Sequence, residues 1–155
     1  MSPVKVVVDT NIFIGAFFHN NKYSQSLLQY NHNNKVKFYF NEDTYNELYY
    51  IFGEMIEKVM NGSNIAKTFE RFGKVMYNIE KIKHKTKVDY CEDKSDNKFI
   101  DCCIDGNIQY LVSEDIHLER INEYKKEIKE KYGIELKILS PFQFNLEMLR
   151  LKFLR

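Results

Sequence analysis

The sequence lacks the features of a disulfide-bonded or zinc-folded domain. It has only three cysteines, Cys91, Cys102 and Cys103, an odd number without the spacing of zinc ligands. Its four histidines are scattered, and it shows no Ser–His–Asp or Cys–His arrangement and no glycine-rich phosphate loop. This use of cysteine is typical of a protein of the reducing cytoplasm.

Charge bias and long apolar runs are also missing. The 23 basic residues are nearly balanced by 22 acidic ones, so any nucleic-acid surface must be local. No apolar run approaches the ~18 residues of a membrane span, and the N-terminus has no signal-peptide pattern. We therefore expect a soluble, cytoplasmic protein that does not enter a membrane.

The sequence does contain short apolar strands that alternate with amphipathic helices. With 155 residues, 44% of them hydrophobic, it can form one sizeable core, and we expect a single domain over residues 1–155. The alternation predicts an α/β fold with a central parallel sheet covered on both faces. Strands are expected at 4–8, 36–40, 110–112 and 135–139 with a short edge strand within 81–87, and helices from about 12, 24, 43, 64, 96, 116 and 141, the third ending at Asn61-Gly62.

Acidic residues recur where the predicted strands end. Asp9 follows the first strand and Asp115 follows the strand at 110–112. The helix starts at Asp96 and near Glu47 belong to the same edge of a parallel sheet, where α/β proteins bind ligands. Asp101 lies one turn after Asn97, off the apolar face of its helix, where it either faces the same cleft or is an ordinary solvated acid.

Each acid also has a structural explanation. Asp9 or Thr10 could cap the first helix, Asp96 could cap the fifth, and Glu47 could complement a helix dipole. Convergence favours a site instead, because two carboxylates ~4 Å apart repel by roughly 4 kcal/mol at an effective dielectric constant near 20. Such a cluster either holds protons at raised pKa or binds a hard divalent cation, and oxygen ligands favour Mg²⁺ or Mn²⁺.

These motifs resemble those of the PIN-domain proteins, and more narrowly the PIN-family toxins of bacterial toxin–antitoxin systems. The resemblance covers nearly the whole chain in the right order. It rests on Val7-Val8-Asp9-Thr10-Asn11, Tyr45-Asn46-Glu47-Leu48, the block from Asp93 to Cys102, the block from Tyr110 to Asp115, and the closing Ile138-Leu139-Ser140-Pro141.

The resemblance implies a three-layer α/β/α fold and an endoribonuclease that depends on Mg²⁺ or Mn²⁺ and hydrolyses RNA phosphodiester bonds. It leaves open which of Asp96, Asn97 and Asp101 ligates the cation directly. The residues expected to act are the catalytic acids Asp9, Glu47, Asp96 and Asp115; the metal ligands Asp9, Asp96, Asp101 and Asp115; the supporting hydrogen bonders Thr10, Asn11 and Ser113; and the RNA-binding lysines Lys98, Lys83 and Lys85, with Lys87 as a further candidate.

Two other functions fit parts of the pattern. A phosphohydrolase with Asp9 as covalent nucleophile, of the haloacid-dehalogenase kind, needs a second Asp where this chain has Asn11. A catalytically silent PIN-like domain would bind RNA or protein without cleaving it. Phosphoaspartate trapping would favour the first, and binding without turnover in Mn²⁺ the second.

The aromatic content, 12 Phe and 11 Tyr, exceeds the evident need of one core. Adjacent pairs such as Phe17-Phe18 and Tyr49-Tyr50 point ~100° apart on a helix and do not fit one narrow stripe. We therefore expect an exposed apolar patch, which would serve a homodimer and a small antitoxin protein.

Overall fold

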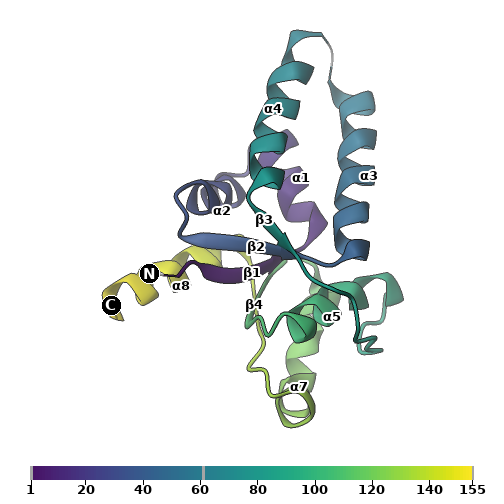
Figure 1. The fold of residues 1–155 in the computed structure, drawn as a ribbon, viewed down its shortest axis with the longest axis vertical. Helices are drawn as coiled ribbons and strands as arrows, with labels where there is room; N and C mark the ends of the chain where they lie inside the picture. The colour runs from purple at the N-terminus through teal and green to yellow at the C-terminus, as the bar shows by residue number, and fades with distance from the viewer. Residues whose placement is uncertain (1, 61, 155) are drawn as a thin grey trace.

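A five-stranded, entirely parallel sheet forms the centre of the molecule (Figure 1). The computed structural model describes residues 2–60 and 62–154. The strand order is β3-β2-β1-β4-β5, so β1 lies in the middle and the chain leaves it first toward one edge and later toward the other. The strands are β1 (Val4–Val8), β2 (Val36–Phe40), β3 (Ile79–Lys81), β4 (Tyr110–Val112) and β5 (Lys137–Leu139).

Helices cover both faces of the sheet, which confirms the predicted three-layer α/β/α architecture. In Figure 1 the pair α3 and α4 rises on one side of the sheet, and α5 and α7 lie on the other. One face carries α1 (Thr10–Phe18), α2 (Lys22–His32), α3 (Glu42–Val59), α4 (Ser63–Tyr77) and α8 (Pro141–Leu154), and the other carries α5 (Asn97–Asp105), α6 (Ile116–Glu119) and α7 (Lys125–Tyr132), with the 3₁₀ turns η1 (Lys94–Asp96) and η2 (Arg120–Tyr124).

The central strands β1 and β4 are largely apolar because both of their faces are buried where they pair. In β1, Val6 and Val8 belong to the core under α1 and α3, whereas Val7 belongs to the core under α5. β4 alternates in the same way, with Leu111 on the α5 side. This two-sided burial fixes the register of the strands, and therefore which residues reach the edge where they end.

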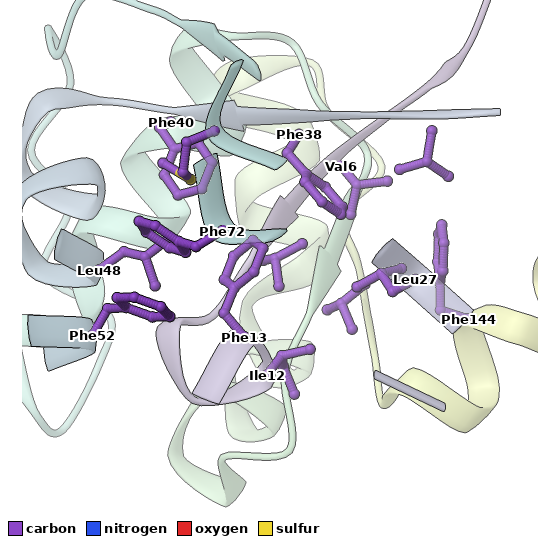
Figure 2. Packing of buried hydrophobic residues seen from close by; sticks show 14 of the residues in the cluster. Val6, Ile12, Phe13, Leu27, Phe38, Phe40, Leu48, Phe52, Phe72 and Phe144 are labelled. Carbon is purple, nitrogen blue, oxygen red and sulfur yellow. The ribbon is translucent and has the colours of Figure 1, made fainter. Parts of the chain in front are cut away.

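The core under α1 and α3, which we call the first core, is rich in phenylalanine (Figure 2). Phe13 packs edge-on against Phe38 at 5.3 Å between ring centroids, and Phe52 stacks on Phe72 at 3.8 Å. The neighbours Phe17 and Phe18 both pack against Phe52, at 5.6 and 5.3 Å. The core is therefore wide enough to take up both members of that pair, although both stay half-buried.

A capping box fixes the start of α3, the helix that carries Glu47. The Asn41 side chain accepts a hydrogen bond from Thr44 N at 2.9 Å, and the Thr44 hydroxyl lies 3.1 Å from Asn41 N. Both residues are buried. Because two orphan donors are satisfied at once, the first turn of α3 and the position of Glu47 one turn later are well defined.

Some predicted boundaries are wrong. The edge strand is Ile79–Lys81, earlier than predicted, and the basic segment after it has no regular secondary structure. The single charged helix expected after Asp115 is divided into α6, η2 and α7, and the last strand is only Lys137–Leu139. The turn residue Asn61 lies outside the described residues. Within residues 2–60 and 62–154, none of the helices has the length and apolar character needed to cross a membrane.

Candidate active site

Asp9 and Ser113 meet where two neighbouring parallel strands end. Asp9 follows β1 and Ser113 follows β4, and Asp9 N donates to Val112 O at 2.9 Å. The Ser113 hydroxyl donates to Asp9 Oδ2 at 2.8 Å. Asp9 is only 4% exposed, and its side chain makes no cap hydrogen bond of regular geometry to α1, although the Asn11 backbone N–H in the first turn of α1 lowers its pKa. Its position is the switch point of the sheet, where α/β folds bind ligands.

Asp115 joins the same hydrogen-bond chain. Its backbone N–H donates to the Ser113 hydroxyl oxygen at 3.0 Å, so Ser113 links Asp115 to Asp9. Its own Oδ1 accepts from His117 N at 2.8 Å and caps the short helix α6. Asp115 Oδ2 has no hydrogen-bond partner among the described residues, so one oxygen is left for a ligand.

Asp96 lies at the junction of η1 and α5 and makes no cap hydrogen bond. Burial, followed by the negative charges of Asp115, Asp93 and Asp9, raises the pKa of Asp96 to about 6. The ionised form of a carboxyl that is half-buried beside other carboxylates loses hydration, and here no cap hydrogen bond compensates that loss. Its ionised form is therefore destabilised until a cation or a proton compensates it.

Glu47 approaches this group from α3, on the opposite face of the sheet. The Thr10 hydroxyl donates to its Oε1 at 2.6 Å, and the Lys98 ammonium lies 2.5 Å from its Oε2. Both oxygens of Glu47 are therefore already engaged. Asn11, by contrast, presents an exposed side chain, and only its backbone N–H acts on Asp9.

The carboxylates affect one another's protonation. Burial raises the pKa of Asp9, and the charges of Asp115 and Glu47 raise it further, while Ser113 and the Asn11 backbone N–H lower it. Nevertheless, within the part of the chain that is described, no group of three or more His, Cys, Asp or Glu side chains already has the geometry of an ion site. The acids lie close enough to affect one another's pKa, but not close enough to surround a single ion. Their all-oxygen donor set fits Mg²⁺ or Mn²⁺.

Asp101 lies apart from these acids and is 3% exposed. Its Oδ1 accepts from Val88 N at 2.7 Å, and its Oδ2 contacts His84 Nε2 at 2.7 Å. His84 Nδ1 in turn lies 2.8 Å from Asp43 Oδ2. Since both oxygens of Asp101 are occupied by the segment after β3, its position is that of a structural anchor.

Asp101 is the middle member of a polar ladder along α5. Asn97 Oδ1 accepts from the backbone N–H groups of Tyr90 and Cys91, and Asp105 accepts from those of Lys85 and Thr86. The three ladder residues are four apart, so they share one helix face. They hold residues 82–91, which we call the strap. Their side chains accept the backbone hydrogen bonds that a neighbouring strand would otherwise accept. This spacing is visible in the sequence and would have indicated the ladder.

The strap turns alternate side chains toward solvent. Lys83, Lys85 and Lys87 are exposed, whereas Ile82, His84, Thr86 and Val88 point inward. The predicted RNA-binding lysines of the strap therefore form an outward-facing row. Lys98 is different, because its side chain is only 13% exposed and faces Glu47.

The chain is similar to known proteins over most of its length. A family model described as PIN domain matches residues 5–117, and the chain belongs to the PIN domain family. An uncharacterized protein of Methanocaldococcus jannaschii is 27% identical over 143 residues, 91% of this chain and 89% of that protein. Among solved structures, a chain of VapBC2 from Rickettsia felis, crystallised with a promoter DNA fragment, superposes with a TM-score of 0.54. It is 14% identical, covering 88% of this chain and 98% of that one, and shows the fold.

The raised pKa values make a prediction for the metal-free protein. An acid whose folded pKa is raised opposes folding when ionised, so Asp96→Asn should raise the melting temperature by a few degrees near pH 7.5. The gain should disappear below about pH 4, where Asp96 is protonated in both states. Asp9→Asn should be no less stable than wild type. Thermal unfolding in EDTA tests both.

Asp93→Asn is the matched control. Hydrogen bonds from Ser95 lower the pKa of Asp93, so its ionised form supports folding and its removal should not stabilise the protein. A clear loss of stability in metal-free Asp9→Asn or Asp96→Asn would mean that these acids are structural.

His84 predicts a second pH dependence. Burial alone lowers the pKa of His84, but the hydrogen bonds and charges of Asp101 and then Asp43 outweigh it and raise the pKa. The stabilisation is therefore complete below the unfolded value of ~6.5 and is lost as pH rises through the folded pKa. The melting temperature of wild type should exceed that of His84→Gln clearly at pH 6 and only slightly at pH 9. His32→Gln, which removes an exposed histidine, is the control.

Proposed function

We propose that this PIN-domain protein is an endoribonuclease that hydrolyses RNA phosphodiester bonds with Mg²⁺ or Mn²⁺. The proposal is supported by the hydrogen-bond chain that links Asp9 and Asp115 through Ser113 at the carboxyl edge of the sheet. Beyond the effect of burial, the charges of Asp115 and Glu47 raise the pKa of Asp9, and those of Asp115, Asp93 and Asp9 raise the pKa of Asp96. A cluster of this sign and chemistry needs a hard cation to be stable in its ionised form. We propose further that residues 1–155 act as one nuclease domain.

Asp9, Asp96 and Asp115 are the proposed ligands. Ser113 fixes Oδ2 of Asp9 and the His117 N–H fixes Oδ1 of Asp115, which orients their remaining oxygens. When bound, a divalent cation lowers the pKa of water and neutralises charge on the phosphate oxygens. Glu47, oriented by the Thr10 hydroxyl, is suited to accept a proton from the attacking water. Asp101 is not included among these ligands, since the strap and His84 occupy both of its oxygens.

The substrate contacts are proposed from the surface next to these acids. The outward row of Lys83, Lys85 and Lys87 on the strap can follow an RNA backbone, and such contacts are sequence-independent and salt-sensitive. A cytoplasmic location agrees with three buried free thiols and an RNA substrate. The sequence resemblance to PIN-family toxins and the similarity to a VapBC2 chain support an antitoxin as protein partner.

Self-association is proposed from α8. Phe142, Leu146, Leu149 and Phe153 follow the spacing i, i+4, i+7, i+11 on one helix face and are 48%, 51%, 49% and 85% exposed. The opposite face of α8 buries Phe144 in the first core. A helix that is apolar on two faces leaves one of them for a partner, and a second copy of the same stripe would match it in a two-fold dimer.

Cleavage assays test the nuclease proposal. Wild-type protein should cut defined single-stranded and structured RNAs in Mn²⁺ or Mg²⁺, and EDTA should stop the reaction. Asp9→Asn and Asp115→Asn should each lower cleavage by at least about 10³-fold, because each removes a ligand charge, while circular dichroism shows an unchanged fold. Full cleavage by either variant would refute the metal-site proposal. RNA binding in Mn²⁺ without any cleavage would identify a silent domain.

Sedimentation velocity at tens of micromolar tests the partner proposal. Wild type should be a dimer, and Leu146→Glu should be a monomer because it places a charge in the apolar stripe. Tyr50→Glu on α3, where Tyr50 is 68% exposed, is the control and should stay dimeric.

Addition of the product of an adjacent small gene should abolish RNase activity. A monomeric wild type without an inhibitory neighbour would contradict both partner assignments and leave the nuclease assignment intact.

A further inference from the structure

Lys98 is the positive charge set inside the carboxylate cluster. Its Nζ lies 2.5 Å from Glu47 Oε2 and also donates to the Ser95 backbone oxygen. The side chain is 13% exposed, against 77% for Lys94 on the preceding turn. A lysine this buried requires a partner, so its position is set by Glu47 and the Ser95 carbonyl.

The backbone around Lys98 is held as firmly as its side chain. The Lys98 carbonyl accepts from the Asn41 side-chain amide at 3.0 Å, which ties the start of α5 to the capping box of α3. Glu47 lies on the second turn of that same α3. The two charges are therefore presented to each other by two helices on opposite faces of the sheet, and the ion pair does not depend on a chance surface rotamer.

The hydrogen-bond pattern separates Glu47 from the three aspartates. Glu47 has both oxygens engaged, by Thr10 and Lys98. Asp9 and Asp115 each have one oxygen engaged in the contacts described above, and Asp96 has no cap bond. The Lys98 ammonium thus forms its ion pair with Glu47, and it acts on Asp96 only as a nearby charge that lowers a pKa raised by burial and by Asp115, Asp93 and Asp9.

We propose that Lys98 is a resident counter-cation that competes with the divalent ion for Glu47. In the metal-free protein it compensates Glu47; on metal binding, Glu47 turns from Lys98 to the cation or its water, and the ammonium becomes available for an RNA phosphate. This inference rests on the proposed function. It makes Lys98 a positioning residue that lowers metal affinity, because the two cations repel each other and the ammonium holds Glu47 away from the ion and its water.

Titration calorimetry of Mn²⁺ into the metal-free protein tests the sign of this coupling. Lys98→Met should bind Mn²⁺ at least about fivefold more tightly than wild type, since a repelling charge and a competitor are both removed. Lys98→Arg keeps the cation and should stay near wild type. Lys94→Met removes an equal charge from the same segment, paired with Asp89 and not with Glu47, and should change affinity little.

A second measurement does not need the metal. In EDTA, Lys98→Met should lower the melting temperature, because Glu47 then remains half-buried beside other acids without a counter-charge. The double variant Lys98→Met/Glu47→Gln should recover most of that loss. If Lys98→Met itself is too unstable to purify, Lys98→Gln serves in both measurements.

The outcomes separate this inference from the nuclease proposal. Mn²⁺ binding and RNA cleavage by wild type, with equal or weaker binding by Lys98→Met, would overturn the counter-cation role and leave the nuclease intact. Weaker Mn²⁺ binding by Lys98→Met than by wild type would show that Lys98 orients Glu47 for ion binding. A wild type that neither binds Mn²⁺ nor cleaves RNA would overturn both.

Discussion

Mutual repulsion of carboxylates at the end of β1 and β4 is the constraint around which this structure is arranged. Asp9 and Asp115 are brought together by strand pairing, which the apolar core enforces. A single hydroxyl, Ser113, donates to Asp9 and accepts from the Asp115 backbone. Thr10 and Lys98 compensate Glu47. The fold thus supplies hydrogen bonds and one ammonium against this repulsion, while burial, together with the charges of neighbouring acids, still raises the pKa of Asp9 and Asp96.

Helix α5 connects this site to the rest of the molecule. Its apolar face packs under the sheet through Phe99, Ile100 and Cys103. A second face holds the strap through Asn97, Asp101 and Asp105. Asp96 and Lys98 extend from its N-terminal end into the carboxylate cluster. The strap with its row of lysines, Asp96 and Lys98 are therefore all positioned by one helix, whereas Asp9, Asp115 and Glu47 are positioned by β1, β4 and α3.

The sequence predicted the sheet and most of its helices because their apolar periodicity is strong. Val4–Val8, Val36–Phe40 and Tyr110–Val112 are strands as predicted, since both of their faces are buried. The predicted boundary of the edge strand is wrong, because long-range hydrogen bonds determine the structure of the segment that follows it. Residues 82–91 have no regular secondary structure, because side chains of α5, and not a neighbouring strand, accept hydrogen bonds from their backbone. The aromatic surplus is divided between a wide core, which takes both Phe17 and Phe18, and exposed positions such as Tyr50 and Phe153.

The sequence by itself determined that acids follow β1 and β4, because strand ends and helix starts are local features and parallel strands end at one edge. It did not distinguish Asp101 from Asp96. Helical spacing gives the angle of a side chain around α5, but only the tertiary structure decides which segment covers that angle. The strap covers Asp101, whereas Asp96 faces the other acids. The contact between Glu47 and Lys98 was likewise decided by tertiary structure, since it joins helices from opposite faces of the sheet, 51 positions apart in the chain.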